Sequence, residues 1–388
     1  MRILYSHRTR SADGQRVHID ALTRALAARG HEVLIVGPEG AQLAGGDTVL
    51  DAGGGGAPLG LPRLMHEGAE VAYGALAAAR LVRAGLRFGP DVLYERYNLY
   101  HHAGQAARRA LGVPWLLEVN APLVEERMAH GVGGAGGRKN GLAMPAAARA
   151  SEDRLWRGAD AALPVTRVLA DMMEARGVRP GRLHVVPNAV DRTGRAGGRD
   201  RTRARLGLEG RLVLGFTGFV RDWHGVDAAL RWLPQDPRAV LLLVGDGPHA
   251  DALRAQAAAL GVPDRFVVTG VVQRDAIPDH VAAFDVALQP AATAYASPLK
   301  LQEYMVEARA ILGPDQPNIR ETVTDGRSAL LVPPGDEAAL HAALTRLADD
   351  EALRDRLGAA ARALIFERDM TWAGNARRVA GIAEGLLG

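Results

Sequence analysis

The sequence predicts an α/β protein built from two doubly wound parallel-sheet domains. Short apolar runs alternate with segments of helical periodicity along all 388 residues, the pattern that parallel sheets with crossover helices produce. The runs form two series, and a polar, glycine-rich stretch over 191–203 separates them as a hinge would. A chain of this length with 48% hydrophobic residues can build two cores, because domains cluster at roughly 100–200 residues.

The elements of each half follow from this periodicity. The first helix is expected to carry Ile19, Leu22 and Leu26 on one buried face and to stop at Arg29-Gly30. Expected strands of the first half are 3–5, 32–36, 91–95, 115–119, 161–165 and 183–187. Those of the second half are 212–216, 240–244, 266–269, 286–289, 310–312 and 329–332.

Composition excludes several classes of protein. The chain has no cysteine, which rules out disulfides, thiolate zinc sites and cysteine nucleophiles and fits a cytoplasmic protein. It begins directly in a core strand, so no signal peptide is expected, and no apolar run approaches the roughly 20 residues of a membrane span. The net charge of +3 fits a solvated surface, and no motif supports nucleic-acid binding.

Two basic and apolar stretches raise the question of peripheral contact with the inner face of the membrane. Residues 2–10 and 62–88 combine basic and apolar side chains. However, Glu67, Glu70 and many alanines dilute the pattern, so an ordinary packed helix is favoured over membrane contact.

A motif in the second half predicts an anion site at the start of a helix. In A-S-P-L-K-L-Q-E, Ser297 is expected to cap the helix, and Pro298 to occupy its first position, where no backbone donor is needed. The amides of Leu299 and Lys300 then point out of the helix start, and Lys300 adds a mobile positive charge. Glu303 follows on the same helix and can accept hydrogen bonds from hydroxyls. A diphosphate held by the amides and a ribose held by the carboxylate make a nucleotide-sugar site.

This motif resembles the donor-binding motif of glycosyltransferase family 4, a family of retaining enzymes with the GT-B fold. The family places two glutamates eight positions apart; Glu303 matches the second, which binds the ribose hydroxyls, and Tyr295 stands at the first. The segments A-I-L-G-P-D, N-I-R-E and D-G-R-S-A-L-L-V-P-P-G-D are also similar to the family, and the likeness covers the whole chain. It implies two Rossmann-like domains facing across a cleft: an acceptor-side domain over 1–192, a donor domain over 193–371, and a last helix over 372–388 that crosses back.

The resemblance also implies where the rest of the donor binds. In G-F-T-G-F-V-R-D-W-H-G, Phe219 and His224 stand where the family has an arginine and a lysine on the diphosphate, and Arg221 is displaced by two positions. Arg221 is still a candidate, because a guanidinium matches phosphate geometry; a solvent-exposed arginine is the alternative. His224 carries only partial charge at neutral pH. Backbone groups around Gly270 and Val271 are expected to frame the nucleobase.

Two further groups are candidates in the first half. Asp13-Gly14 aligns with the paired glycines of the family, although a helix cap is favoured for Asp13 over substrate contact. His18 follows on the expected helix where relatives carry a histidine, and packing or exposure to solvent is the equal alternative to a site role. Glu118 and Asn120 lie on one face at the end of a strand, at the edge where such sheets bind ligands. Asn120 replaces a family histidine near the reacting carbon, so its amide can bind a sugar hydroxyl but cannot transfer a proton. Glu118 is either part of the site or a structural hydrogen-bond acceptor.

Other motifs have plainer interpretations. His101 and His102 lack convergent carboxylates, so a sugar-contacting loop or a helix cap is favoured over a metal site. The glycine-rich stretch 131–141 is expected to form a loop that closes over an acceptor or stays unstructured. The sequence V-G-D-G-P-H-A resembles an NAD fingerprint but lies outside an N-terminal βαβ unit, and Asp246 and Pro248 favour a structural turn. No metal and no cofactor are therefore expected.

The family resemblance implies a retaining transfer of sugar from a nucleoside-diphosphate sugar to a hydroxyl acceptor whose identity stays open. A UDP-sugar is favoured and a GDP-sugar is the second choice. Catalysis is assigned to Arg221 and Lys300, which stabilise the leaving diphosphate, with Asn120 and Glu118 beside the sugar. A GT-B sugar-nucleotide epimerase and a non-catalytic sugar-nucleotide binding protein are the alternatives, the latter because of Tyr295 and Asn120. The oligomeric state is left open.

Overall fold

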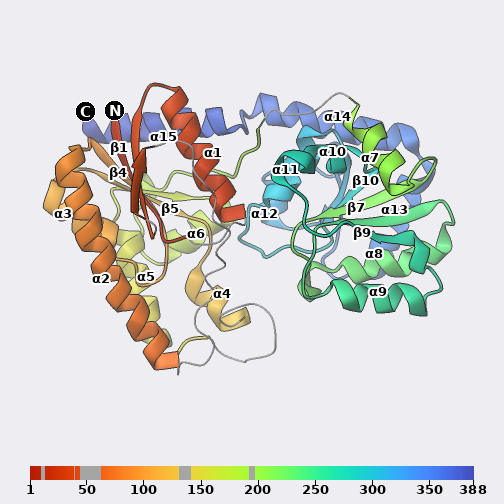
Figure 1. Cartoon of the computed structure of the whole chain (residues 1–388), viewed down its shortest axis with the longest axis horizontal. Coiled ribbons are helices and arrows are strands. Elements are labelled where there is room, and N and C mark those ends of the chain that lie inside the picture. The colour runs from red at the N-terminus through yellow and green to blue at the C-terminus, as the bar shows by residue number, and fades with distance from the viewer. Residues whose placement is uncertain (10–13, 39, 44–62, 131–140, 192–196) are drawn as a thin grey trace. The chain divides into compact units, whose positions relative to one another are not determined.

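The computed structural model describes residues 1–9, 14–38, 40–43, 63–130, 141–191 and 197–388. The chain divides into two compact units (Figure 1). Unit 1 comprises Met1–Pro187 together with Trp372–Gly388, and unit 2 comprises Asn188–Thr371. Each unit is a parallel sheet covered by helices, so the predicted α/β class with two doubly wound domains is confirmed.

The sheet of unit 1 has the order β3-β2-β1-β4-β5-β6. Its strands are β1 (Arg2–Ser6), β2 (Glu32–Gly37), β3 (Gly40–Leu43), β4 (Val92–Arg96), β5 (Trp115–Val119) and β6 (Ala161–Pro164). All pairs are parallel except β2–β3, a short antiparallel edge that the sequence did not predict. The predicted strand 183–187 is wrong: Leu183 forms a single bridge with Ala162, and His184 and Val186 donate backbone hydrogen bonds to Ala162 and Pro164, but no strand forms.

Unit 1 contains seven α-helices among its described residues: α1 (Gly14–Ala28), α2 (Arg63–Phe88), α3 (Ala103–Leu111), α4 (Leu123–His130), α5 (Pro145–Gly158), α6 (Arg167–Ala175) and α15 (Trp372–Leu387). As predicted, Ile19, Leu22 and Leu26 form the buried face of α1. The C-terminal helix α15 packs against α1. Asn375 lies in the first turn of α15, and its side chain donates a hydrogen bond of 2.7 Å to the carbonyl of Pro187.

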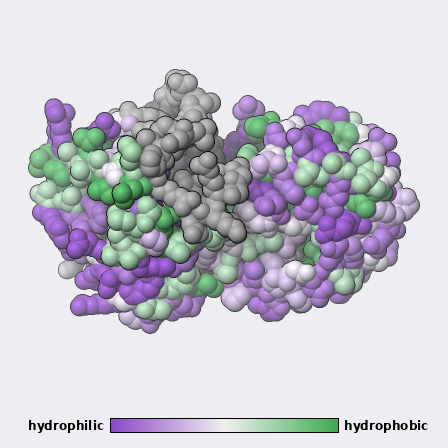
Figure 2. All heavy atoms as spheres, turned by 90° about the horizontal axis from the view of Figure 1, so that it is seen from below, coloured by the Kyte–Doolittle hydropathy of each residue, from purple (hydrophilic) through white to green (hydrophobic). Residues whose placement is uncertain are grey.

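Helix α2 corrects one argument made from the sequence. Glu67 and Glu70 do not dilute its exposed face, because both are buried, at 3% and 6% exposure. Glu67 accepts a hydrogen bond from the Tyr100 hydroxyl, and Glu70 pairs with Arg127. Hydrophilic residues nevertheless cover much of the described surface on the face shown in Figure 2. Across the described ranges, no helix has both the length and the apolar character needed to cross a membrane.

The sheet of unit 2 is entirely parallel, in the order β12-β11-β10-β7-β8-β9. Its strands match the predicted series: β7 (Leu212–Thr217), β8 (Ala239–Val244), β9 (Phe266–Val268), β10 (Val286–Leu288), β11 (Ala310–Pro314) and β12 (Leu330–Val332). Alternate residues enter two different cores; Leu214 and Phe216 join one, and Val213 joins the other. Strands buried on both faces explain why these runs are continuously apolar rather than alternating.

The helices of unit 2 are α7 (Gly198–Leu206), α8 (Val226–Trp232), α9 (Ala250–Ala259), α10 (Ile277–Ala282), α11 (Leu299–Val306), α12 (Pro317–Arg320), α13 (Glu337–Asp349) and α14 (Glu351–Glu367). The predicted hinge 191–203 is therefore wrong in its second part, which forms most of α7. Residues 192–196 lie outside the described ranges.

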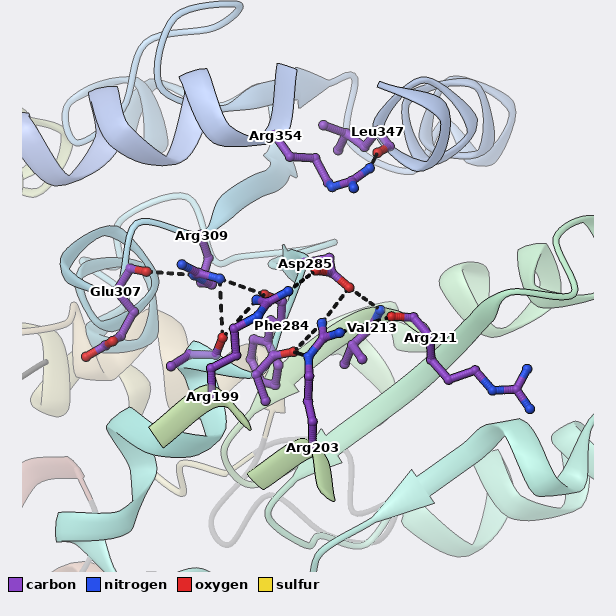
Figure 3. Close-up of polar contacts among 12 residues, drawn as sticks. Arg199, Arg203, Arg211, Val213, Phe284, Asp285, Glu307, Arg309, Leu347 and Arg354 are labelled. Carbon is purple, nitrogen blue, oxygen red and sulfur yellow. Dashed lines mark hydrogen bonds and ion pairs between the residues drawn. The ribbon is translucent and has the colours of Figure 1, made fainter. Parts of the chain in front are cut away.

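An arginine cluster explains why this polar segment is helical (Figure 3). Arg199 and Arg203 of α7 each donate to Asp285, with N–O distances of 2.6 Å, at the amino end of β10. The backbone N–H of Val213 donates to the same carboxylate at 2.8 Å. Burial alone would raise the pKa of Asp285, but the Val213 amide and the two guanidiniums hold this pKa below its usual range. The cluster ties α7 to the amino-terminal edge of the sheet.

Candidate active site

The start of α11 differs from the prediction by one residue. Pro298 is the N-cap, and Leu299 is the first helical residue. Ser297 does not cap the helix, because its hydroxyl accepts a hydrogen bond of 3.2 Å from the backbone N–H of Asn188. The Asn188 side chain also donates to the Ser297 carbonyl at 2.6 Å. The amides of Leu299 and Lys300 still lie in the first turn, as an anion site requires.

The body of α11 is fixed to the end of β7. The Tyr304 hydroxyl accepts a hydrogen bond of 3.0 Å from the backbone N–H of Thr217, the last residue of that strand. Asn318 holds the loop before α11 by donating to the carbonyls of Thr293 and Ala296. These contacts hold the start of α11 in place.

Lys300 reaches from α11 toward the end of β7. Its Nζ lies 3.7 Å from the centre of the Phe216 ring, and a β-carbon on Gly218 would lie 3.7 Å from the same nitrogen. Burial lowers the pKa of Lys300 to about 7, although the Glu303 carboxylate opposes this shift. Within the part of the chain that the structure describes, no oxygen accepts a hydrogen bond from this ammonium. Lys300 thus lacks a hydrogen-bonded anionic partner among the described residues, and Glu303 is the carboxylate that acts on it.

His224 and Arg221 lie beside Lys300. The Nδ1 atom of His224 accepts a hydrogen bond of 2.9 Å from the backbone N–H of Arg221, so the neutral ring carries its proton on Nε2. Burial, Lys300 and Arg221 lower the pKa of His224 to about 3. The position is therefore a neutral N–H donor and not the cation that the family has there. The Arg221 guanidinium lies 5.6 Å from the centre of the exposed Phe219 ring.

Glu303 follows Lys300 on α11. Burial raises the pKa of Glu303, and Lys300 and Arg274 oppose the shift. Among the described residues, none donates a hydrogen bond to this carboxylate, which leaves its oxygens available to ligand hydroxyls.

Glycines bring three strand ends of unit 2 together. Gly218, Gly245 and Gly270 follow β7, β8 and β9, and all have positive φ angles of 110°, 137° and 69°. A β-carbon on Gly245 would lie 2.3 Å from the Gly218 carbonyl oxygen, and Gly245 also bridges to Gly270. A β-carbon on Gly247 would likewise lie 2.2 Å from the Val220 carbonyl oxygen. This close approach supports the interpretation of G-D-G-P as a structural turn rather than an NAD-binding fingerprint. Sequence reasoning missed Gly218 and Gly245 as site-shaping residues, although a glycine directly after each strand was a visible signal.

The predicted nucleobase frame lies on the same edge. Gly270 is in contact with Gly245, and the side chain of Val271 is 86% exposed. Unit 2 therefore brings Lys300, His224, Arg221 and Glu303 together around the end of β7 and the start of α11, with the glycine-lined strand ends beside them.

The candidates of unit 1 gather around one buried carboxylate. Glu118 is 2% exposed; its Oε2 lies 2.7 Å from the Tyr94 hydroxyl and 3.1 Å from Nε2 of His18. Arg96 and Asn120 donate to Oε1. Burial alone would raise the pKa of Glu118, but His18 and Arg96, together with the Asn120 hydrogen bond, hold this pKa well below its usual range.

His18 lies between Glu118 and the C-terminal helix. Its ring meets Trp372, the first residue of α15, edge-on at a centroid distance of 4.7 Å. Gly14 is the first residue of α1, whereas Asp13 lies outside the described residues. The structure thus brings His18, Glu118 and Asn120 together in unit 1.

The adjacent histidines do not act as a pair. His101 is buried 3.5 Å from Glu95, and burial lowers the pKa of His101 to about 3 and raises that of Glu95 to about 8. His102 instead meets the Ser151 hydroxyl at 2.9 Å. No group of three histidine or acidic side chains able to hold a metal ion occurs within the described ranges. Most of the predicted acceptor loop 131–141 lies outside those ranges.

Two family models match this chain. Residues 13–189 match the glycosyl transferase 4-like domain, and residues 211–350 match the glycosyl transferases group 1. A D-inositol 3-phosphate glycosyltransferase of Frankia alni is 30% identical, over 96% of this chain and 94% of the relative. Two parallel-sheet units with these matches define a glycosyltransferase of the GT-B fold. The chain belongs to the group 1 glycosyltransferases of the family 4 type, as its donor motif predicted.

Other relatives match over shorter stretches. A 2-deoxystreptamine N-acetyl-D-glucosaminyltransferase of Streptomyces fradiae is 39% identical over 36% of this chain and 34% of its own length. A 2-deoxystreptamine glucosyltransferase of Streptomyces kanamyceticus is 29% identical over 64% and 65%. The chain thus spans less than two thirds of these relatives. The Anabaena protein HepE, solved with UDP-glucose, has the same fold, with a TM-score of 0.76 at 17% identity over 100% of both chains.

Proposed function

We propose that this protein is a retaining glycosyltransferase that moves a hexose from a nucleoside-diphosphate sugar, preferably a UDP-sugar, to a hydroxyl acceptor. The observation that carries the proposal is the set of groups on and beside α11. Lys300 lacks a hydrogen-bonded anionic partner among the described residues, His224 offers an N–H, and Glu303 offers free oxygens. HepE, which shares the fold, was solved with UDP and with UDP-glucose, and this supports uridine as the base.

Each group then has a role in binding the donor. Lys300, Arg221 and Nε2–H of His224 contact the diphosphate together with the first amides of α11. Glu303 accepts hydrogen bonds from the ribose hydroxyls. The nucleobase lies against Gly270 and Val271.

The same groups lower the barrier to transfer. The bond between the anomeric carbon and the phosphate oxygen breaks, and the acceptor oxygen bonds to that carbon on the same face. The acceptor proton passes to the leaving phosphate, so no side-chain base is needed. Negative charge grows on the diphosphate during this step, and cations already in place stabilise it more in the transition state than in the ground state.

The names of the relatives narrow the acceptor. One group acts on D-inositol 3-phosphate and another on 2-deoxystreptamine. Both molecules are six-membered carbon rings that carry several hydroxyls. We therefore propose that the acceptor is a small cyclitol. We propose separately that the reaction takes place in the cytoplasm, which the lack of cysteine fits.

A turnover assay tests the proposal. Purified protein is given UDP-glucose or UDP-N-acetylglucosamine with myo-inositol, inositol 3-phosphate, 2-deoxystreptamine or no acceptor. UDP release that depends on one acceptor is the expected result. UDP release without any acceptor, with a rearranged sugar, would indicate an epimerase. Tight UDP binding without turnover across the panel would indicate a binding protein.

A further inference from the structure

We propose that unit 1 holds a binding site for an alkyl phosphate, a molecule that joins one apolar chain to a phosphate group. The site is a groove between helix α2 and the strands β2 and β3. None of its described lining residues belongs to the groups assigned to the donor, so the proposal does not rest on the proposed function.

The groove is large enough for a small molecule. Its volume is about 460 Å³, within the roughly 300–1,000 Å³ that ligand pockets have. One wall comes from the C-terminal part of α2, and the other comes from β1, β2 and β3. All of the described lining residues belong to unit 1, so these walls need no contribution from unit 2.

The strand wall is apolar because side chains alternate along β2. Leu34 and Val36 face the groove. Val33 and Ile35 point to the other face of the sheet, where they are 2% and 5% exposed. Gly40 of β3 adds no side chain, and a β-carbon there would have no atom within 4 Å. The groove therefore reaches the face of the sheet itself.

The helix wall supplies further apolar contact. Ala84 and Phe88 are four residues apart on α2, so they lie one above the other on the same side of the helix. Phe88 is buried, and the guanidinium of Arg2 lies over its ring, 4.4 Å from the centre. An apolar chain in the groove would lie between these side chains and those of β2, which is favourable because apolar surface leaves water.

Three arginines give the groove a positive rim. Arg80, Arg83 and Arg87 line it from α2, at the i, i+3 and i+7 spacing that places side chains on one side of a helix. All three are exposed, and across the described ranges none of them has an ion pair. Arg2 differs, because it pairs at 3.2 Å with Glu32, the only carboxylate among the described lining residues. The rim therefore has an excess of positive charge.

Apolar walls beneath a positive rim select the class of ligand. Guanidinium groups match phosphate oxygens in bidentate fashion, and a phosphate offsets the mutual repulsion of the three arginines. A sugar phosphate would leave the apolar walls unfilled, and a neutral amphiphile would leave the arginines without an anion. An alkyl phosphate satisfies both. A free alkyl phosphate and a membrane lipid offer the same chemistry, and vesicle binding separates these two sources.

Calorimetric titration of the full chain with decyl phosphate, below its micelle concentration, tests the proposal. One molecule should bind per chain. Decyl maltoside has the same chain without the charge, and inorganic phosphate has the charge without the chain. Each of these should bind at least about tenfold more weakly than decyl phosphate. No binding of decyl phosphate, or equal affinity for decyl maltoside or inorganic phosphate, would overturn the site.

Two substitutions separate the charge of the groove from its shape. Arg83→Gln removes one guanidinium and should weaken decyl phosphate binding about tenfold, as for one hydrogen bond to a charged group. Ala84→Leu fills the groove without a change of charge and should weaken binding as well. Arg29→Gln and Ala28→Leu, at the exposed end of α1, are the matched controls and should bind as the wild type does. If thermal unfolding shows that Ala84→Leu is not folded, Arg83→Gln decides, and unchanged affinity in that variant would overturn the site.

Flotation with phosphatidylcholine vesicles, with and without phosphatidic acid, identifies the source of the phosphate. Binding that needs phosphatidic acid and that both Arg83→Gln and Ala84→Leu weaken supports the groove with a membrane lipid as its ligand. Binding of decyl phosphate without binding to vesicles supports a free alkyl phosphate. Vesicle binding that only Arg83→Gln weakens, without binding of decyl phosphate, indicates a charged surface and overturns the groove.

UDP binding separates this proposal from the proposed function. Arg83 and Ala84 lie in unit 1, outside the groups of unit 2 that are proposed to bind the donor. Both variants should therefore bind UDP as the wild type does. If no donor and acceptor pair reacts, the proposed function fails, and the titrations with decyl phosphate still test the groove.

Discussion

At the scale of single residues, Lys300 has a pKa that a bound diphosphate is expected to change. Without a diphosphate, burial beside Phe216 lowers its pKa to about 7, so near neutrality many molecules carry an uncharged amine. A bound diphosphate would stabilise the ammonium and raise that pKa again. Donor affinity should therefore be full below about pH 7 and should fall as the pH rises, because binding must then recruit a proton.

Proton uptake checks this directly. At about pH 8, one unit above the pKa of Lys300, calorimetric titrations with UDP in two buffers of different ionisation enthalpy should show that binding takes up protons. The Lys300→Met variant should bind UDP weakly and take up none. Uptake that persists in this variant would assign the proton to another group, and an absence of uptake in the wild type would mean that Lys300 is charged beforehand.

Glu303 is tested through affinity. Removing a carboxylate that accepts from the ribose should weaken UDP binding by about 1.5–3 kcal/mol, as for a hydrogen bond to a charged group. Calorimetry on Glu303→Ala measures this. Glu307→Ala, at the C-cap of the same helix, is the control and should bind UDP as the wild type does. Unchanged affinity in Glu303→Ala would refute the ribose contact.

The sequence predicted which residues of unit 2 lie together beside α11 but not their chemical states. The spacing of Lys300 and Glu303 on one helix follows from local sequence. The neutral His224 and the saturated Glu118 do not, because their states depend on burial and on partners from other strands. A residue's pKa is a property of the packed structure, and single-sequence patterns do not contain it.

At the scale of elements, a long-range contact overrode a local rule. Ser-Pro favours a serine N-cap, but the hydroxyl of Ser297 is taken by Asn188, which is 109 residues away in the chain. The polar stretch 191–203 was also interpreted incorrectly, because its long-range contacts are not visible in the local sequence. Its arginines indicated a solvated hinge, whereas two of them bind Asp285 and make part of the stretch helical.

Asp285 should therefore be essential for the stability of unit 2. Asp285→Ala leaves Arg199 and Arg203 without their carboxylate and should cost about 3–5 kcal/mol in the free energy of unfolding. Urea unfolding measures the change. Asp251→Ala, which removes an exposed ion pair with Arg254, is the control and should cost about 0–1 kcal/mol. Equal effects of the two variants would contradict a structural role for the cluster.

The sign of the pH dependence follows from the lowered pKa of Asp285. Its stabilisation is present above the pKa of an unfolded aspartate, about 3.9, and is lost as the pH falls toward the folded value. The difference in stability between the wild type and Asp285→Ala should therefore shrink in acid.

At the scale of the whole molecule, the alternation of strands and helices was predictable because continuously apolar strands are the signature of sheets buried on both faces. The short edge strand β3 could not be predicted, because Gly40–Leu43 has no β-branched or aromatic residue. The stretch 183–187 had a strand-like composition but forms only one bridge, at Leu183, and two backbone hydrogen bonds to β6. Composition thus predicted the sheets, and tertiary context set their edges.

The positively charged groups proposed for the donor site of unit 2 lead us to expect transfer without a metal ion. Lys300, Arg221 and the amides of α11 are proposed to stabilise the leaving diphosphate, a role that a magnesium ion has in other enzymes. Transfer should therefore continue in excess EDTA at close to the untreated rate. Activity that EDTA abolishes and magnesium restores would refute this assignment.

The configuration of the product tests the central claim most directly. Attack on the face that the phosphate leaves preserves the configuration at the anomeric carbon. NMR of the first product formed from an α-linked UDP-sugar should therefore show an α-glycosidic linkage to the acceptor. A β-linkage in that first product would contradict the account, because it requires attack from the opposite face and a base to activate the acceptor.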